Sequence, residues 1–104
     1  MSYKIIRTDE YFKKLKKFIK KHPDVLQRYI KTIELLELDP FHPSLRLHKL
    51  HGQLNDCYSI SINMKYRIVI DFLIVNNEII PIDIGSHDEV YHSVRKTQSF
   101  RAGI

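Results

Sequence analysis

The sequence predicts a single α+β domain in which an N-terminal strand and an antiparallel helical hairpin pack on a mainly antiparallel sheet. Apolar residues in the first half of the chain recur at steps of three and four, as on one face of a helix. In the second half they alternate with polar residues, as along a half-buried strand. The 104 residues, 43% of them apolar, fill one core of modest size. We expect this domain to span residues 1–91, followed by a basic tail over residues 92–104 that either docks or frays.

The first helix follows a short strand over residues 3–7. Thr8 or Asp9 can cap it, because either side chain can accept a hydrogen bond from the free amides of the first turn. Its apolar stripe consists of Tyr11, Phe12, Leu15, Phe18 and Ile19. Lysines occupy the other face, at positions 13, 14, 16, 17, 20 and 21. This face is either solvated or contacts phosphates, and in the second case we expect Lys13, Lys17 and Lys20 to bind the ligand.

The second helix begins near Pro23, whose missing N–H would have no intrahelical partner in a first turn. Its apolar stripe consists of Val25, Leu26, Tyr29, Ile30, Ile33 and Leu36. Pro40 and Pro43 end it, because proline removes a donor and restricts the residue before it. The two helices therefore form an antiparallel hairpin.

The extended segments begin after Leu45. In residues 57–62 apolar and small side chains alternate, so we expect one face on the core and the other lining a polar surface. The core face carries Tyr58, Ile60 and Ile62, and the polar face carries Cys57, Ser59 and Ser61. Residues 66–75 form the next strand, with Arg67 and Asp71 opposite its apolar face. Asn76-Asn77 suits a two-residue turn because asparagine tolerates positive φ, and residues 78–84 return as the last strand of an antiparallel meander.

The charge balance favours a polyanionic partner. The chain has 17 Lys and Arg against 12 Asp and Glu, which gives a formal charge of +5 and a pI near 9.4. The excess of positive charge lies in residues 1–52.

The cellular compartment is predicted from the cysteine content and from the apolar runs. Cys57 is the only cysteine, so no intrachain disulfide can form, and we expect a buried thiol in a reducing cytoplasm. No apolar run approaches the length of a membrane span, so we expect no membrane partner.

Residues 46–52 concentrate groups that bind phosphate and transfer protons. Their candidates are Arg46, His48, Lys49 and His51. If the segment stays extended, the first two side chains share one face and the last two share the other, so all four converge only at a bulge or turn.

Residues 85–91 follow a strand and hold His87 and Tyr91 four positions apart. Histidine titrates near neutral pH and can give or take a proton, and tyrosine can stack on a base or bind a phosphate. Together with the basic first half, this segment indicates chemistry on nucleic acid.

Several other chemistries lack their motifs. The sequence has no metal-ligand spacing, no glycine-rich phosphate loop and no Gly-x-Ser-x-Gly, so we expect neither a metal nor a cofactor. Acid–base cleavage of a phosphodiester needs only a base for the ribose 2′-OH, an acid for the leaving 5′-oxygen and cations for the charged phosphorane. Suitable groups are His48, Lys49, His51, Arg67 and His87.

The chain resembles the RelE/ParE superfamily of bacterial toxins, particularly its RelE-like and YafQ-like ribonuclease branch. The matching stretches are residues 48–52, 58–69 and 84–91, and with the two helices the resemblance covers residues 3–91. It implies the RelE-like toxin fold and a toxin of a type II toxin-antitoxin system that cleaves mRNA on the ribosome without a metal. It also implies a cognate antitoxin, through which the complex reaches operator DNA.

The resemblance also implies roles for individual residues. His87 matches the catalytic histidine of YafQ-like members, Tyr91 matches the aromatic residue four positions later, and His48 matches the histidine before the family's Leu-x-Gly turn. Arg67 lies in a Tyr-Arg-hydrophobic strand motif and either binds phosphate or is structural.

The chain departs from the family pattern at two positions. Where YafQ-like members have a second histidine and an aspartate, this sequence has Ser61 and Lys65. Serine cannot shuttle protons near neutral pH, whereas Lys65 can contact a phosphate as the lysines of RelE-like proteins do.

Two other functions remain open. A ParE-like toxin that binds and inhibits DNA gyrase shares the fold but generally lacks the histidine-rich site. A module that binds RNA or an antitoxin without any activity would leave RNA uncut.

Overall fold

The computed structural model describes residues 2–50, 57–73, 76–86 and 88–90 of the chain. Its elements are β1 (Lys4–Ile5), α1 (Asp9–Lys21), η1 (Pro23–Val25), α2 (Leu26–Leu38), η2 (Pro43–Leu45), β2 (His48–Lys49), β3 (Cys57–Ser61), β4 (Tyr66–Leu73) and β5 (Glu78–Ser86). Residues 88–90 form a further helical turn. No helix within these ranges is long and apolar enough to span a bilayer.

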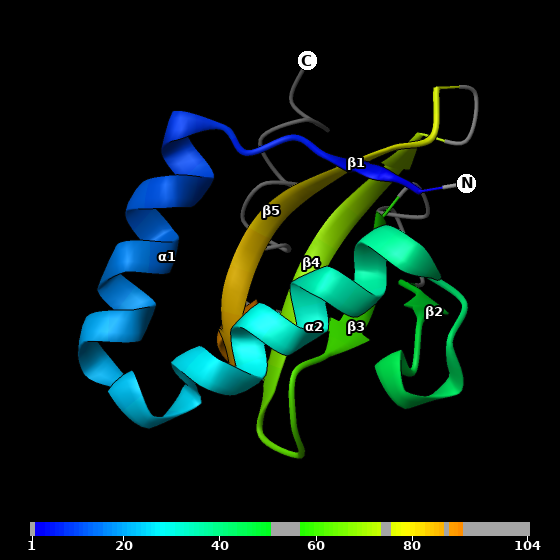
Figure 1. Cartoon of the computed structure of the whole chain (residues 1–104). Helices are drawn as coiled ribbons and strands as arrows, with labels where there is room; N and C mark the ends of the chain where they lie inside the picture. Colours follow the sequence, from blue (N-terminus) through cyan, green and yellow to red (C-terminus); the bar gives the residue numbers. More distant parts are fainter. Residues whose placement is uncertain (1, 51–56, 74–75, 87, 91–104) are drawn as a thin grey trace.

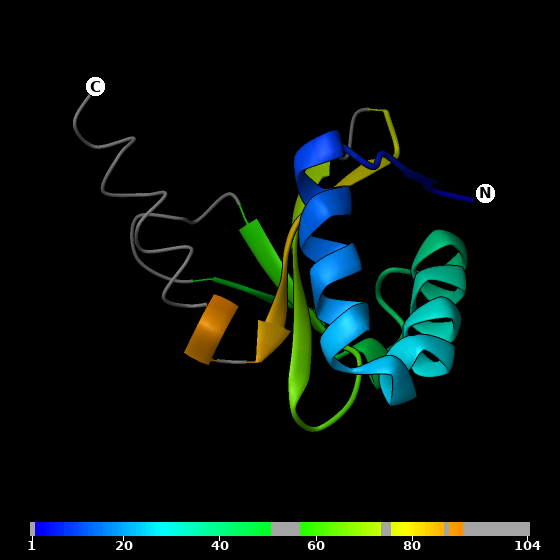
Figure 2. The same ribbon diagram turned by 90° about the vertical axis from the view of Figure 1, so that its left-hand side faces the viewer.

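The strands form one sheet in the order β1-β5-β4-β3-β2. The meander of β3, β4 and β5 is antiparallel, as the sequence predicts, and β2 adds to it antiparallel. Only β1 runs parallel to its neighbour, β5. Figures 1 and 2 show α1 and α2 on one side of the sheet and residues 88–90 on the other. The predicted α+β fold is confirmed.

The N-terminus of α1 is capped by a side chain. Oγ1 of Thr8 accepts a hydrogen bond of 3.1 Å from the amide of Tyr11, which satisfies one of the free donors of the first turn. Asp9 and Glu10 lie in the first turn and two lysines in the last, so both ends complement the helix dipole. The helix ends at Lys21, and the amide of the next residue, His22, donates to the carbonyl of Phe18.

The main core lies between the helices and the sheet. Its buried members are Tyr11, Phe18, Val25, Tyr29, Ile33, Leu36, Leu45, Ile60, Ile62, Ile68, Ile70, Ile79 and Ile84. The hydroxyls of Tyr11 and Tyr29 form a hydrogen bond of 3.0 Å inside it, which links α1 to α2. This bond gives each of the two buried hydroxyls a hydrogen-bond partner, and the Arg7 side chain also interacts with Tyr29.

Three members of the expected helical stripes do not belong to this core. Phe12, Leu26 and Ile30 are 52%, 39% and 45% exposed. Each lies at the margin of its stripe, and the sheet covers only the central rows of a helix face. The predicted stripes were therefore too wide.

A second, smaller cluster lies on the opposite face of the sheet. Leu50, Cys57, Val69 and Val90 are buried there, with Ile82 packed against them. The burial of Cys57 is confirmed, but the expected polar surface beside it is wrong at this position and at Ser59, which is also buried. Both are covered because Leu50, before β3, and Val90, after β5, pack on this face.

β5 contains a β-bulge, which changes the direction in which its backbone N–H and C=O groups point along its outer edge. Val69 pairs with Asp83 and Ile70 with Pro81, so Ile82 is the extra residue. Proline, which has no N–H to donate, suits such a position. Because β1 pairs with β5 only at Glu78 and Ile79, the outer edge of β5 beyond the bulge carries no strand within the described residues.

The turn between β4 and β5 contains Asn76 and Asn77, as expected. Asn77 has a φ of 54°, a left-handed conformation that asparagine adopts more readily than most residues.

Candidate functional site

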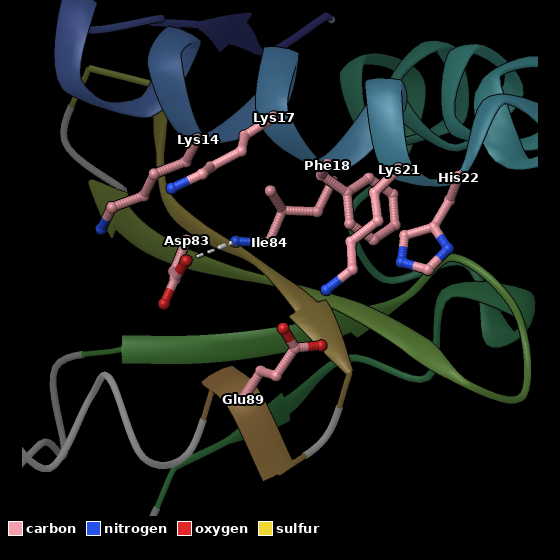
Figure 3. Close-up of a pocket in the computed structure, with 8 residues that line it drawn as sticks. All are labelled: Lys14, Lys17, Phe18, Lys21, His22, Asp83, Ile84 and Glu89. Atoms are coloured by element: carbon pink, nitrogen blue, oxygen red, sulfur yellow. Dashed lines mark hydrogen bonds between the residues drawn. The ribbon is translucent and has the colours of Figure 1, made fainter.

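A pocket of about 380 Å³ opens between the C-terminal half of α1 and the outer edge of β5. It is lined by Lys14, Lys17, Phe18, Lys21, His22, Asp83, Ile84 and Glu89. Figure 3 shows the α1 side chains extending toward β5, and Glu89 rising toward them from the helical turn after β5. The pocket therefore joins segments more than sixty residues apart in the sequence.

The lysines that reach this pocket share one face of α1. Lys14, Lys17 and Lys21 are spaced by three and four residues, which places them on one side of a helix. Nζ of Lys14 donates to the carbonyl of Ile82 at 3.4 Å, so it satisfies a backbone acceptor on the β5 edge. Lys13 and Lys20, which the sequence nominates as ligand contacts, are exposed and do not line the pocket.

Two carboxylates face the lysines, and each also satisfies a backbone amide. Asp83, only 8% exposed, accepts a hydrogen bond of 2.8 Å from the amide of Ile84. Glu89 accepts one of 3.1 Å from the amide of Ser86, and its own amide donates to the Ser86 hydroxyl at 3.2 Å. This reciprocal pair is a capping box, which begins the turn of residues 88–90.

The pKa of Glu89 is lowered from its ordinary value. The main causes are the hydrogen bonds from the backbone and side chain of Ser86, which favour the charged form, and the positive charges of Lys21 and His22 add to them. The carboxylate therefore stays ionised at neutral pH.

His22 and Tyr66 form an aromatic wall that the sequence analysis missed. The His22 ring centroid lies 4.9 Å from that of Phe18 and 4.7 Å from that of Tyr66. Nδ1 of His22 is 3.3 Å from the Tyr66 hydroxyl. The position of His22 at the end of the lysine-rich helix was the only signal available, because its partner Tyr66 comes from a distant strand.

The predicted residues of 46–49 lie at the other edge of the sheet. His48 and Lys49 form β2 and are both exposed, with His48 opposite Ser59. Arg46 adopts a left-handed conformation with φ 49° after η2, and its carbonyl lies 3.3 Å from Nδ1 of His48. Arg46 therefore lies in the turn after η2 and is not part of β2.

Arg67 lies on β4 between these two edges. Its Nη1 donates to the Ser59 hydroxyl at 3.3 Å, and its backbone pairs with Ser61 on β3 and with Gly85 on β5. Since Ser59 is the partner of His48 in β2, the register brings His48, Arg67 and Gly85 into neighbouring rows.

Ser61 and Lys65 flank the turn between β3 and β4. The Ser61 hydroxyl donates to the carbonyl of Asn63 at 2.7 Å. Lys65 is exposed, and its amide donates to Oδ1 of Asn63 at 2.9 Å. Lys65 therefore belongs to a turn and leaves its ammonium group in solvent.

Three of the expected catalytic residues, His51, His87 and Tyr91, lie outside the described residues. Among the residues that the structure does describe, His, Cys, Asp and Glu form no group of three suited to a metal ion.

Comparison with known proteins identifies the family. A family model described as a RelE-like toxin of the type II toxin-antitoxin system HigB matches residues 4–87. A search of curated proteins gave no significant match.

Solved structures share the architecture over most of the chain. In the Escherichia coli DinJ-YafQ toxin-antitoxin complex, a chain of 13% identity superposes with a TM-score of 0.70, covering 88% of this chain and 99% of that one. A YoeB/ParE toxin from Agrobacterium tumefaciens has 15% identity and a TM-score of 0.66, with coverage of 81% and 98%. A copper-bound mutant toxin from Helicobacter pylori has 25% identity and a TM-score of 0.61, with coverage of 86% and 98%.

The YafQ and YoeB/ParE matches, at their low identity, show the common fold. They agree with the RelE/ParE superfamily that the sequence resembles, and the family model assigns the chain directly. The chain belongs to the RelE-like toxins of type II toxin-antitoxin systems.

Proposed function

We propose that this toxin is a metal-independent endoribonuclease that cleaves mRNA on the ribosome. His48 or His51 takes the proton of a ribose 2′-OH, and the 2′-oxygen attacks the adjacent phosphorus. His87 protonates the leaving 5′-oxygen, so the products end in a 2′,3′-cyclic phosphate and a 5′-hydroxyl. Lys49 and Arg67 stabilise the negative charge of the phosphorane.

The other nominated residues hold the RNA. Arg46 and Lys65 bind phosphates next to the cleaved one, and Tyr91 positions a base or a phosphate. On α1, Lys13, Lys17 and Lys20 contact ribosomal RNA.

The observation that supports this assignment is the register of the sheet. His48 pairs with Ser59, Ser59 accepts a hydrogen bond from Arg67, and Arg67 pairs with Gly85, two residues before His87. A proton-transfer group and a cation thus share one end of the sheet, next to the segment that carries the proposed acid. RelE-like toxins are generally endoribonucleases, and this arrangement is consistent with that chemistry.

The test is a translating ribosome extract to which purified toxin is added, with mRNA ends mapped by primer extension. We expect cuts within codons for the unmodified toxin, and none for folded variants His87→Ala and His48→Ala if His48 is the base. His42→Asn is the matched control, because His42 is not one of the proposed site residues and asparagine keeps the acceptor for the Ser44 amide. Intact mRNA with a folded, growth-inhibiting toxin would refute the nuclease.

A second candidate function is inhibition of DNA gyrase. The structural similarity to a protein described as a YoeB/ParE toxin supports this alternative. A gyrase supercoiling assay separates the two, because a gyrase inhibitor blocks supercoiling and leaves mRNA intact. A module that only binds would do neither.

We also propose a cognate antitoxin as the physiological partner in the cytoplasm. The structural relative YafQ occurs in a complex with DinJ. The basic first half of this chain suits an acidic segment, which would compete with RNA for the same cations. In the complex, we expect the antitoxin to contact the operator DNA.

A further inference from the structure

We propose that the pocket between α1 and β5 binds one nucleotide, with its phosphate on Lys17 and Lys21 and the amino group of its base on Asp83 and Glu89. The inference rests on the proposed function only for the source of the nucleotide, which would be RNA. It assigns a ligand to a surface distinct from the nominated cleavage residues on β2 and β4.

The phosphate end is indicated by two lysines whose ammonium groups form no hydrogen bond or ion pair in the described part of the chain, while the charge of Lys21 acts on Glu89 across the pocket. Lys14 is occupied by the Ile82 carbonyl, whereas no hydrogen bond or ion pair within the described residues engages the ammonium groups of Lys17 and Lys21. The two lysines lie four residues apart on the same helix face, so one phosphate can reach both.

The base end is indicated by the two carboxylates opposite. Asp83 and Glu89 each accept a hydrogen bond from a backbone amide, and Glu89 also interacts with the Ser86 side chain, which fixes both carboxylates. A carboxylate has about four lone-pair sites, so each can still accept a further hydrogen bond. An acidic peptide or a bare polyphosphate would be repelled by this end, and a basic peptide by the lysines. A nucleotide carries both an anionic phosphate and amino donors, so it complements both ends.

The size and the apolar surface of the pocket agree with such a ligand. Its volume of about 380 Å³ is at the small end of the range of ligand pockets. Phe18 and Ile84 form the apolar part, and the His22 ring continues it. Phe18 is 7% exposed and belongs to the core, so the half-buried His22 ring is the aromatic surface on which a base can stack.

The first experiment measures binding of GMP, AMP, CMP and UMP to the full-length toxin by NMR titration. The three nucleotides with an exocyclic amino group should bind more tightly than UMP. Lys17→Ala/Lys21→Ala should weaken their binding about tenfold, the scale of losing charged hydrogen bonds. The control Lys16→Ala/Lys31→Ala removes the same charge outside the pocket and should change binding less than about twofold. Equal losses in both variants, or equal binding of UMP, would overturn the inference.

The second experiment uses Glu89→Gln, because glutamine keeps the acceptor for the Ser86 amide but removes the charge. If Glu89 receives an amino group of the base, this variant binds GMP more weakly and inorganic phosphate no more weakly than the parent. If the carboxylate only repels anions, it binds both more tightly, and the assignment of the base end is wrong.

A third comparison separates a free nucleotide from one within RNA. An uncleavable 2′-O-methyl tetranucleotide should bind more tightly than any mononucleotide and should lose that affinity in the Lys17→Ala/Lys21→Ala variant. A tetranucleotide that binds no better than GMP would contradict RNA as the source. These titrations contain no ribosome, so they test the pocket separately from the nuclease. If the toxin cleaves mRNA but binds no nucleotide, only the pocket proposal is rejected. If it binds nucleotides but cleaves no mRNA, only the nuclease proposal is rejected.

Discussion

At the scale of single residues, the hydrogen bond between Tyr11 and Tyr29 is the main polar contact between the two helices. Both side chains are buried, and their hydroxyls lie 3.0 Å apart. A buried hydroxyl that loses a partner costs more than the bond contributes when it is made, so the removal of either hydroxyl affects the other.

We therefore expect Tyr11→Phe to lower the free energy of unfolding by about 1–3 kcal/mol, because it leaves the Tyr29 hydroxyl without this partner. The double variant Tyr11→Phe/Tyr29→Phe should lose less than the sum of the single variants, since it removes both polar groups together. Urea unfolding of the four proteins measures this coupling. Strict additivity would show that the two hydroxyls do not depend on each other.

The same pair makes stability sensitive to alkaline pH. Burial raises the pKa of Tyr11 far above 10.0 and also raises that of Tyr29. The native state then keeps protons that the unfolded chain loses, so stability is full below pH 10 and falls as the pH rises above it. Unfolding free energies measured from pH 8 to pH 11 should decline steeply at the upper end. The decline should be shallower in Tyr11→Phe, and an identical slope would contradict this origin.

At the scale of elements, β5 packs closely against the helical turn of residues 88–90. The contact involves Gly85 and Glu89, and Glu89 also lines the pocket. A Cβ added at Gly85 would lie 3.3 Å from Cβ of Glu89. That atom is held by the backbone of the turn and cannot move away alone. The capping box of Ser86 and Glu89 fixes the same turn.

Gly85→Ala should therefore push the turn away from the strand and cost about 1–3 kcal/mol of stability, as overpacking does. It should also displace the Glu89 carboxylate from the pocket. Thermal unfolding measures the first effect, and the NMR shift of the Ser86 amide measures the second. Ser86→Ala is an informative comparison, because it removes one bond of the box without adding volume, and it should cost about 1 kcal/mol. An unchanged Ser86 amide in Gly85→Ala would show that the strand end absorbs the added methyl.

At the scale of the whole molecule, the uneven distribution of charge governs association with RNA. The formal charge of +5 derives from the first half of the chain, where α1 carries most of the lysines. Charged contacts with nucleic acid release counterions, so each one increases the dependence of affinity on salt.

Reversal of Lys13, Lys17 and Lys20 to glutamate should weaken ribosome binding more at low salt than at high salt. The slope of log affinity against log salt should fall by about 0.7–0.9 for each phosphate contact that is lost. Sedimentation with ribosomes over a range of salt concentrations measures this slope. Lys4→Glu, which reverses a charge on β1 and not on α1, should leave it nearly unchanged. Unchanged association in the triple variant would remove α1 from the ribosome-binding surface.

The fold could be predicted because its main signals are local. Helical spacing and strand alternation within short stretches of sequence predict α1, α2, β3 and β4. The parallel pairing of β1 with β5 and the cover over Cys57 and Ser59 could not be predicted, because they join segments distant in sequence. The pocket is non-local in the same way, since Lys21 and Glu89 meet only after the sheet has formed.

Cys57 is a natural probe of local opening at the second face of this sheet. It is the only thiol of the chain and is 3% exposed in the folded protein. A thiol reagent can modify it only when the residues that cover this face, Leu50 and Val90 among them, move away, so its rate of labelling measures how often that happens. The labelling rate of Cys57 therefore measures how often this face of the sheet becomes exposed. A ligand that stabilises the folded state should lower that rate.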